Sequence, residues 1–124
     1  MAEQPLKGLR ILVVEDEYLL ADDVAEELTN AGAEVLGPVP SIEEAHTLIA
    51  SGAAIDAALL DVNLRGEMVY PVADALAERG IPFALATGYD RWALPERFAD
   101  AVRLEKPLKT RKIVASLAPL LQRS

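Results

Sequence analysis

Short runs of consecutive apolar residues alternate along the chain with segments in which apolar residues recur every three or four positions. The runs occupy residues 9–14, 34–39, 55–60, 82–86 and 101–104. Most are rich in Val, Ile, Leu or Ala, as expected of strands that are buried on both faces. The run over residues 34–39 is weaker, because Gly37 and Pro38 interrupt it, and this suits an edge strand. Strands that alternate with helices predict an α/β fold in which a parallel sheet is covered on both sides.

Capping and breaking residues mark the ends of the predicted helices. A first helix ends at Gly32, and Ser41 with Glu44 three residues later forms a capping box for a second. Pro71 suits the first turn of a third helix. The last helix is expected over residues 109–121.

The segment over residues 90–100 breaks this regular alternation. A helix belongs between the fourth and fifth strands, but the segment has few periodic apolar positions and carries Pro95. The pattern therefore predicts a short or irregular fourth helix, which a regular helix of three or more turns would contradict.

Length and charge limit the classes of protein that fit. The 124 residues suit one domain over residues 1–124, with no effector domain expected. Twelve Lys and Arg against twenty Asp and Glu give a net charge of −8, which argues against a nucleic-acid or anionic-membrane partner. The chain has no Cys, no secretory signal and no membrane span, so we expect a cytoplasmic protein without disulfides or Cys-ligated zinc.

Polar residues follow the predicted strands at the point where each one ends. Glu15 and Asp16 follow the first strand, Asp61 the third, Thr87 the fourth and Lys106 the fifth. Ligands of open parallel sheets bind beyond the carboxyl ends of the strands. We therefore expect these five side chains to meet in one pocket.

Three carboxylates and one ammonium group give that pocket a net charge of −2. Carboxylates this close oppose each other's ionisation, and a divalent cation would neutralise them. The donors are hard oxygens and the chain has no thiolate, which favours Mg²⁺ over zinc. Asp16 is expected to bind the metal directly, and Glu15 directly or through water.

Mg²⁺ beside a carboxylate, a hydroxyl and a Lys is a set of groups suited to phosphoryl transfer. Asp61 is the candidate nucleophile and would form an aspartyl phosphate. Lys106 and the Thr87 hydroxyl would each contact a phosphoryl oxygen. Gly88 would let the backbone approach the phosphoryl group closely.

Together these residues resemble the receiver domain of two-component response regulators, and the resemblance covers essentially the whole chain. It implies a doubly wound, five-stranded flavodoxin-like sheet in the order 2-1-3-4-5. It also implies that Asp61 takes its phosphoryl group from the phosphohistidine of a histidine kinase or histidine phosphotransfer protein, with slow self-dephosphorylation and no other enzymatic activity. The metal ligands would be Asp16, Asp61 and the backbone carbonyl of Asn63, and phosphorylation would change affinity for a downstream protein target.

Residues 82–89, with the sequence PFALATGY, are similar to a subgroup of single-domain receivers named FAT GUY after this motif. Leu85 stands where the subgroup has its second Phe. The subgroup belongs to alphaproteobacteria and often works with kinases of the HWE type in general stress signalling. The resemblance implies such a kinase as the partner.

Two positions depart from the receiver pattern. Arg103 occupies the place of an aromatic switch residue, and a guanidinium cannot enter an apolar slot without a large desolvation cost. Tyr89 or Trp92 is the candidate for a substitute movement or a partner surface, together with Arg103. Arg65 replaces a usual Pro four residues after Asp61.

Three alternatives use the same fold. The first is a protein-interaction module that is independent of phosphorylation. The second is a phosphohydrolase, although Asn63 stands where such enzymes have an acid two residues after the nucleophile. The third is a mononucleotide or flavin site, which lacks a Gly-rich phosphate loop after the first strand.

Overall fold

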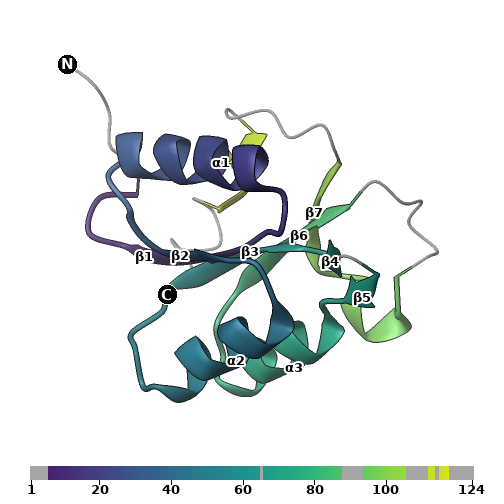
Figure 1. Ribbon diagram of the computed structural model, residues 1–124. Helices are drawn as coiled ribbons and strands as arrows, with labels where there is room; N and C mark the ends of the chain where they lie inside the picture. The colour runs from purple at the N-terminus through teal and green to yellow at the C-terminus, as the bar shows by residue number, and fades with distance from the viewer. Residues whose placement is uncertain (1–5, 65, 88–93, 106–111, 114, 118–124) are drawn as a thin grey trace.

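The computed structural model describes residues 6–64, 66–87, 94–105, 112, 113 and 115–117 (Figure 1). The helices are α1 (Tyr18–Asn30), α2 (Ile42–Ala50), α3 (Tyr70–Glu78) and the 3-10 helix η2 (Glu96–Phe98). The strands are β1 (Arg10–Val14), β2 (Glu34–Val39), β3 (Ala57–Asp61), β4 (Asn63–Leu64), β5 (Glu67–Met68), β6 (Phe83–Thr87) and β7 (Val102–Glu105). None of the described helices is both long and apolar enough to cross a membrane.

The main sheet has five parallel strands in the order β2-β1-β3-β6-β7. Because β6 and β7 are its fourth and fifth strands, this is the predicted order 2-1-3-4-5. Helix α1 covers one face of the sheet, and α2 and α3 lie side by side on the other (Figure 1). The fold is therefore the predicted doubly wound arrangement.

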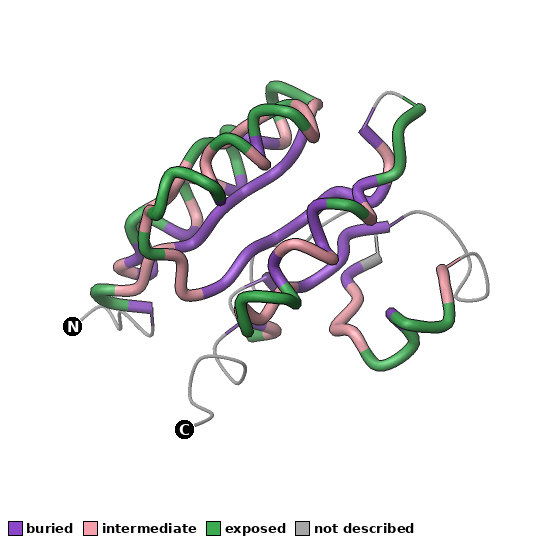
Figure 2. The backbone as a smooth tube through the Cα atoms, turned by 90° about the horizontal axis from the view of Figure 1, so that it is seen from below, coloured by how far each residue is buried: buried purple, intermediate pink, exposed green. Residues whose placement is uncertain are grey.

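Alternating side chains along the strands build two separate hydrophobic cores. Figure 2 shows that the strands of the sheet are largely buried. The core under α1 takes from the sheet Ile11, Val13, Ala57, Leu59, Ala84 and Ala86. The core under α2 and α3 takes Leu12, Val14, Ala58, Leu60 and Leu85. Full burial of one Leu or Val stabilises the fold by about 1.5–3 kcal/mol, so the uninterrupted apolar strands hold the sheet rigidly between its helices.

The predicted helix signals are confirmed where the structure describes them. Ser41 caps α2, since its hydroxyl accepts a hydrogen bond of 3.1 Å from the backbone N–H of Glu44. Pro71 lies in the first turn of α3. The last predicted helix is described at residues 112, 113 and 115–117, which are helical, and its Ile113 and Leu117 are buried.

Gly37 in β2 adopts a φ of +91°, and the pairing of β1 with β2 is irregular beside it. A Cβ atom at this position would lie 2.6 Å from the backbone nitrogen of Val39 and 3.1 Å from the backbone oxygen of Val13. Only glycine fits this backbone, which carries β2 into the Pro38–Pro40 turn.

The predicted irregular fourth helix is confirmed within residues 94–100, where the single 3-10 turn η2 replaces a regular helix. Phe98 is buried there, with its ring 5.4 Å from Tyr70 and 6.0 Å from Phe83. Arg97 forms two hydrogen bonds with Asp74 of α3, at 2.9 and 3.0 Å, and the first of these raises the pKa of Arg97. Aromatic packing and one ion pair therefore fasten this segment to α3.

The sequence analysis did not predict the hairpin that follows Asp61. Strands β4 and β5 pair antiparallel, and the Asn63 side-chain oxygen accepts a hydrogen bond of 2.7 Å from the Gly66 backbone N–H. Gly66 has a φ of +91°. The backbone N–H of Val69 donates to the Val62 carbonyl at 2.8 Å, which closes the hairpin at its base.

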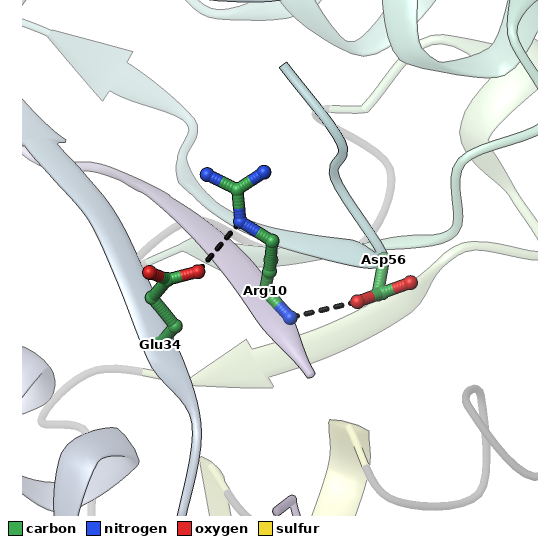
Figure 3. Close-up of polar contacts among 3 residues, drawn as sticks. All are labelled: Arg10, Glu34 and Asp56. Carbon is green, nitrogen blue, oxygen red and sulfur yellow. Dashed lines mark hydrogen bonds and ion pairs between the residues drawn. The ribbon is translucent and has the colours of Figure 1, made fainter. Parts of the chain in front are cut away.

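Opposite charges are paired at the amino ends of the central strands (Figure 3). The Arg10 Nε atom donates to a Glu34 carboxylate oxygen at 2.6 Å. The Arg10 backbone N–H donates to a carboxylate oxygen of Asp56 at 2.7 Å. These contacts join β1 to β2 and to the segment that enters β3.

Candidate functional site

The register of the sheet places the predicted acidic residues at the same level. Val14 at the end of β1 pairs with Leu60 in β3, so Glu15 lies beside Asp61, the last residue of β3. Asp16 follows Glu15 in the turn that leads into α1. The structure thus brings Asp61 together with the neighbouring residues Glu15 and Asp16, although Asp61 lies 45 positions after Asp16 in the sequence.

One carboxylate oxygen from each of Glu15, Asp16 and Asp61 lies within 4.8 Å of the other two. Glu15 and Asp61 are only 5% and 4% exposed, whereas Asp16 is half-buried. Three carboxylates this close repel one another electrostatically. A cation bound among them would offset this repulsion.

Backbone N–H groups help to hold two of these carboxylates. The Glu17 backbone N–H donates to Glu15 Oε1 at 3.0 Å, and the Asn63 backbone N–H donates to Asp61 Oδ1 at 3.4 Å. The Glu15 backbone N–H itself donates to the Val39 carbonyl at 3.0 Å, which ties the acidic turn to β2. The carboxylates of Glu15 and Asp61 are therefore each held by a strand, β1 and β3 respectively, and by a local hydrogen bond.

The donor set fits Mg²⁺. Mg²⁺ binds oxygen at about 2.0–2.1 Å, so two oxygens on opposite sides of one ion are roughly 4.2 Å apart. Oxygens within 4.8 Å of one another therefore fit a hydrated ion that some carboxylates contact directly and others through water. The described lining offers no sulfur ligand that would favour zinc.

Thr87 ends the next strand of the sheet at the same edge. Asp61 pairs with Ala86, so Thr87 lies one residue beyond the level of Asp61, and it is 4% exposed. Thr87 pairs in turn with Glu105, the last residue of β7. The register therefore places Thr87 at the same edge of the sheet as the carboxylates.

Four predicted site residues, Lys106, Gly88, Tyr89 and Trp92, lie outside the described residues, as does Arg65. Arg103 is described: it is half-buried in β7, and its guanidinium donates to the Ala99 backbone carbonyl at 3.0 Å. This contact holds β7 to the end of the η2 segment. The guanidinium is satisfied there by a carbonyl, so it does not take the place of an aromatic ring in an apolar slot.

The hairpin beside Asp61 is the structural feature that the sequence analysis missed. Its signal was nevertheless present, because Asn and Gly are residue types that favour turns. Asn63 precedes the connection between the two strands, and Gly66 lies in it. The hairpin holds the Asn63 backbone beside the Asp61 carboxylate.

Several solved structures share this fold and, in part, this sequence. The chain is 42% identical in sequence to SdrG from Sphingomonas melonis Fr1. The match covers 91% of this chain and 96% of the SdrG chain, with a TM-score of 0.79. A BeF3-activated conformation of SdrG matches with 39% identity and a TM-score of 0.76. This match covers 98% of this chain and 99% of the SdrG chain. A response regulator receiver protein from Sinorhizobium medicae WSM419 matches with 29% identity and a TM-score of 0.79. This match covers 94% of this chain and 96% of that protein's chain.

A curated relative gives the same result from sequence. The sensory transduction protein LytT of Bacillus subtilis is 34% identical over 113 residues. The match covers 88% of this chain but only 46% of LytT, so the chain spans about half the length of this relative. No protein-family model matches the chain.

Receiver domains bind Mg²⁺ through an acidic pocket, and they act as signalling switches and not as metabolic enzymes. The cluster of Glu15, Asp16 and Asp61 at the carboxyl edge of the sheet is such a pocket. With this site, the sheet order and the identity to SdrG over nearly its whole length, the chain belongs to the receiver domains of response regulators.

Proposed function

We propose that the protein is a phosphorylation-controlled switch in which Asp61 accepts a phosphoryl group from the phosphohistidine of a histidine kinase or a histidine phosphotransfer protein. The observation that carries this proposal is the cluster of three carboxylates within 4.8 Å, with Asp61 at its buried end. A structural role alone does not account for three like charges gathered at one edge of a sheet, because such a cluster destabilises the fold.

The transfer uses groups of this chain in distinct roles. An oxygen of the Asp61 carboxylate forms a bond to phosphorus while the bond between phosphorus and the donor imidazole nitrogen breaks, and that nitrogen recovers a proton from solvent. Mg²⁺, when held by Glu15, Asp16, Asp61 and the backbone carbonyl of Asn63, supplies positive charge for the phosphoryl oxygens. The carboxylate is already oriented by the Asn63 N–H, so it does not have to be ordered during the reaction.

Residues at the ends of β6 and β7 complete the proposed site. Thr87 donates its hydroxyl to one phosphoryl oxygen, and Lys106 pairs with another. Gly88 allows the close approach of the backbone. The BeF3-activated conformation of SdrG supports an activated state of this kind, since BeF3 resembles a phosphoryl group in charge and shape.

Phosphorylation is proposed to change the affinity of the protein for a downstream protein target. A shift of a two-state equilibrium from 1:99 to 99:1 requires about 5.5 kcal/mol of differential interaction, to which several charge-assisted hydrogen bonds contribute. Tyr89 and Trp92 are the proposed moving or partner-facing residues, together with Arg103. The Arg103 contact to Ala99 supports a route that does not use an aromatic switch at this position.

The finer assignment is to the FAT GUY subgroup, with a kinase of the HWE type as the phosphoryl donor and a cytoplasmic location. The motif of residues 82–89 supports the subgroup assignment. In this role residues 1–124 act as one receiver module.

The test is incubation of the purified protein with a small acyl phosphate and Mg²⁺, followed by intact mass spectrometry. We expect the addition of one phosphoryl group, and no addition to the Asp61→Asn variant or in the presence of a chelator. The matched control is Asp56→Asn, which changes a carboxylate at the opposite edge of the sheet and leaves the phosphoryl acceptor in place.

Absence of any phosphoryl group on the wild-type protein would contradict the proposal. It would favour the alternative of an interaction module that is independent of phosphorylation. That alternative requires target binding that is the same for the wild type and for Asp61→Ala.

A further inference from the structure

Charge is distributed unevenly along the chain. Residues 11–64 carry twelve Asp and Glu side chains and no Lys or Arg, although the whole chain has twelve basic side chains. This acidic half includes α1, β2, α2, β3 and all of β1 except Arg10, which pairs with Glu34 at the amino edge of the sheet. Apart from Arg10, these elements carry no Lys or Arg side chain to neutralise their surface, so it attracts positively charged partners.

A hollow of about 340 Å³ lies on this surface between the start of α1 and the turn after β2. Its lining includes the proposed metal ligands Glu15 and Asp16, the α1 residues Tyr18, Ala21 and Asp22, and the two prolines Pro38 and Pro40. Asp22 is exposed, and Tyr18 is 81% exposed and so presents a large aromatic ring to solvent. The hollow therefore offers carboxylates beside apolar surface.

A second hollow of about 500 Å³ lies between the start of α2 and the β4–β5 hairpin. Ile42 and Leu64 contribute apolar surface to it, and the exposed residues Glu43 and Glu67 contribute charge. Pro40 lines both hollows, so they adjoin at this residue. We refer to the two joined hollows as the acidic groove; none of its described lining residues is Lys or Arg.

We propose that the acidic groove binds a basic, amphipathic segment of a partner protein. Such a segment would place Lys or Arg side chains beside the carboxylates and apolar side chains against Tyr18, Ile42 and Pro40. The groove combines carboxylates with apolar side chains, and this combination matches an amphipathic peptide better than it matches a single small cation. Nucleic acids and anionic membranes carry the wrong charge.

This inference goes beyond the proposed function, because binding in the groove needs no phosphoryl group on Asp61. It is therefore tested on the unmodified full-length protein without a phosphoryl donor. A protein that binds in the groove but is not phosphorylated would refute the proposed function and leave this inference in place.

The test is an NMR titration of the isotopically labelled protein with a synthetic amphipathic helix made of Lys and Leu. We expect chemical-shift changes concentrated at residues 16–22, 39–43 and 64–67, and weaker binding at higher salt concentration. A peptide with Glu in place of every Lys serves as the control for apolar attraction and is expected not to bind.

Paired variants separate the groove from general attraction to an acidic protein. Glu43→Gln with Glu67→Gln removes two charges from the groove and should weaken binding about tenfold. Glu26→Gln with Glu78→Gln removes two charges from exposed positions outside the groove and should change affinity less than about twofold. All four positions are exposed, so far-UV circular dichroism should show native folds for both variants.

Three outcomes would overturn the inference. Equal loss of affinity in the two paired variants would show only general charge attraction. Equal binding of the acidic peptide would show only apolar attraction. Displacement of the basic peptide by an equal concentration of spermine would show that the groove recognises positive charge alone.

Discussion

The two edges of the parallel sheet differ in how their charged residues are arranged. At the amino edge, Arg10 is paired with Glu34, and its backbone N–H binds Asp56 (Figure 3). At the carboxyl edge, three carboxylates converge within 4.8 Å, and Glu15 and Asp61 are almost fully buried. One edge neutralises its charges within the fold, and the other concentrates charge of one sign.

This difference separates structural residues from functional ones. The exposed ion pair at the amino edge joins neighbouring strands and contributes modestly to stability. The cluster at the carboxyl edge costs stability in the absence of a cation, and two of its members still depend on N–H donors from their own turns. A fold tolerates such a cost at the site where it binds a metal and performs chemistry.

The largest expected effect is on the affinity for Mg²⁺. Asp16→Asn removes the negative charge of a proposed direct ligand and should weaken Mg²⁺ binding by about 100-fold or more, since even residues behind a metal ligand contribute about 10–100-fold. Isothermal titration calorimetry measures this loss. The matched control is Asp23→Asn, which removes an exposed carboxylate from α1 outside the cluster and should bind Mg²⁺ like the wild type.

The next effect is stabilisation of the fold by Mg²⁺. At an Mg²⁺ concentration of about 100 times Kd, the free energy of unfolding should rise by about 2.7 kcal/mol. Without Mg²⁺, Asp16→Asn should be more stable than the wild type, because one of three like charges is gone. Chemical denaturation with and without Mg²⁺ measures both changes, and a wild type that Mg²⁺ leaves unchanged would count against the metal site.

The smallest effects are expected at the amino edge. Glu34→Gln should cost no more than about 1 kcal/mol of unfolding free energy, and less at high salt, because the ion pair is largely exposed. Asp56→Ala should cost about 1–2 kcal/mol, since it removes the acceptor of the Arg10 backbone N–H. Neither variant should alter the affinity for Mg²⁺. A change in Mg²⁺ affinity in either variant would contradict the separation of a structural amino edge from a metal-binding carboxyl edge.

Most of the fold was predictable because its strands are short apolar runs and because Gly32, Ser41 and Pro71 mark helix ends in the sequence. The acidic cluster was predictable because parallel strands bring their carboxyl ends to one edge, so sequence order alone places Glu15, Asp16 and Asp61 together. The irregular segment between β6 and β7 followed from Pro95 and from its weak periodicity.

Features that depend on packing between distant segments could not be predicted. The contact between Tyr70 and Phe98 joins residues 28 positions apart, and no periodicity links them. The acidic groove arises where the turn after β2, the start of α1 and the hairpin come together. The hairpin strands have two residues each, which is too short for any alternating pattern to show.

The most direct test of the central claim locates the phosphoryl group on the chain. After treatment with a small acyl phosphate, reduction with borohydride converts an aspartyl phosphate to homoserine, and peptide mass spectrometry then identifies the position. We predict homoserine at position 61 in the presence of Mg²⁺ and none when Mg²⁺ is chelated. Homoserine at another aspartate, or equal amounts with and without Mg²⁺, would contradict the claim that the carboxyl edge of this sheet is a Mg²⁺-dependent phosphoacceptor site.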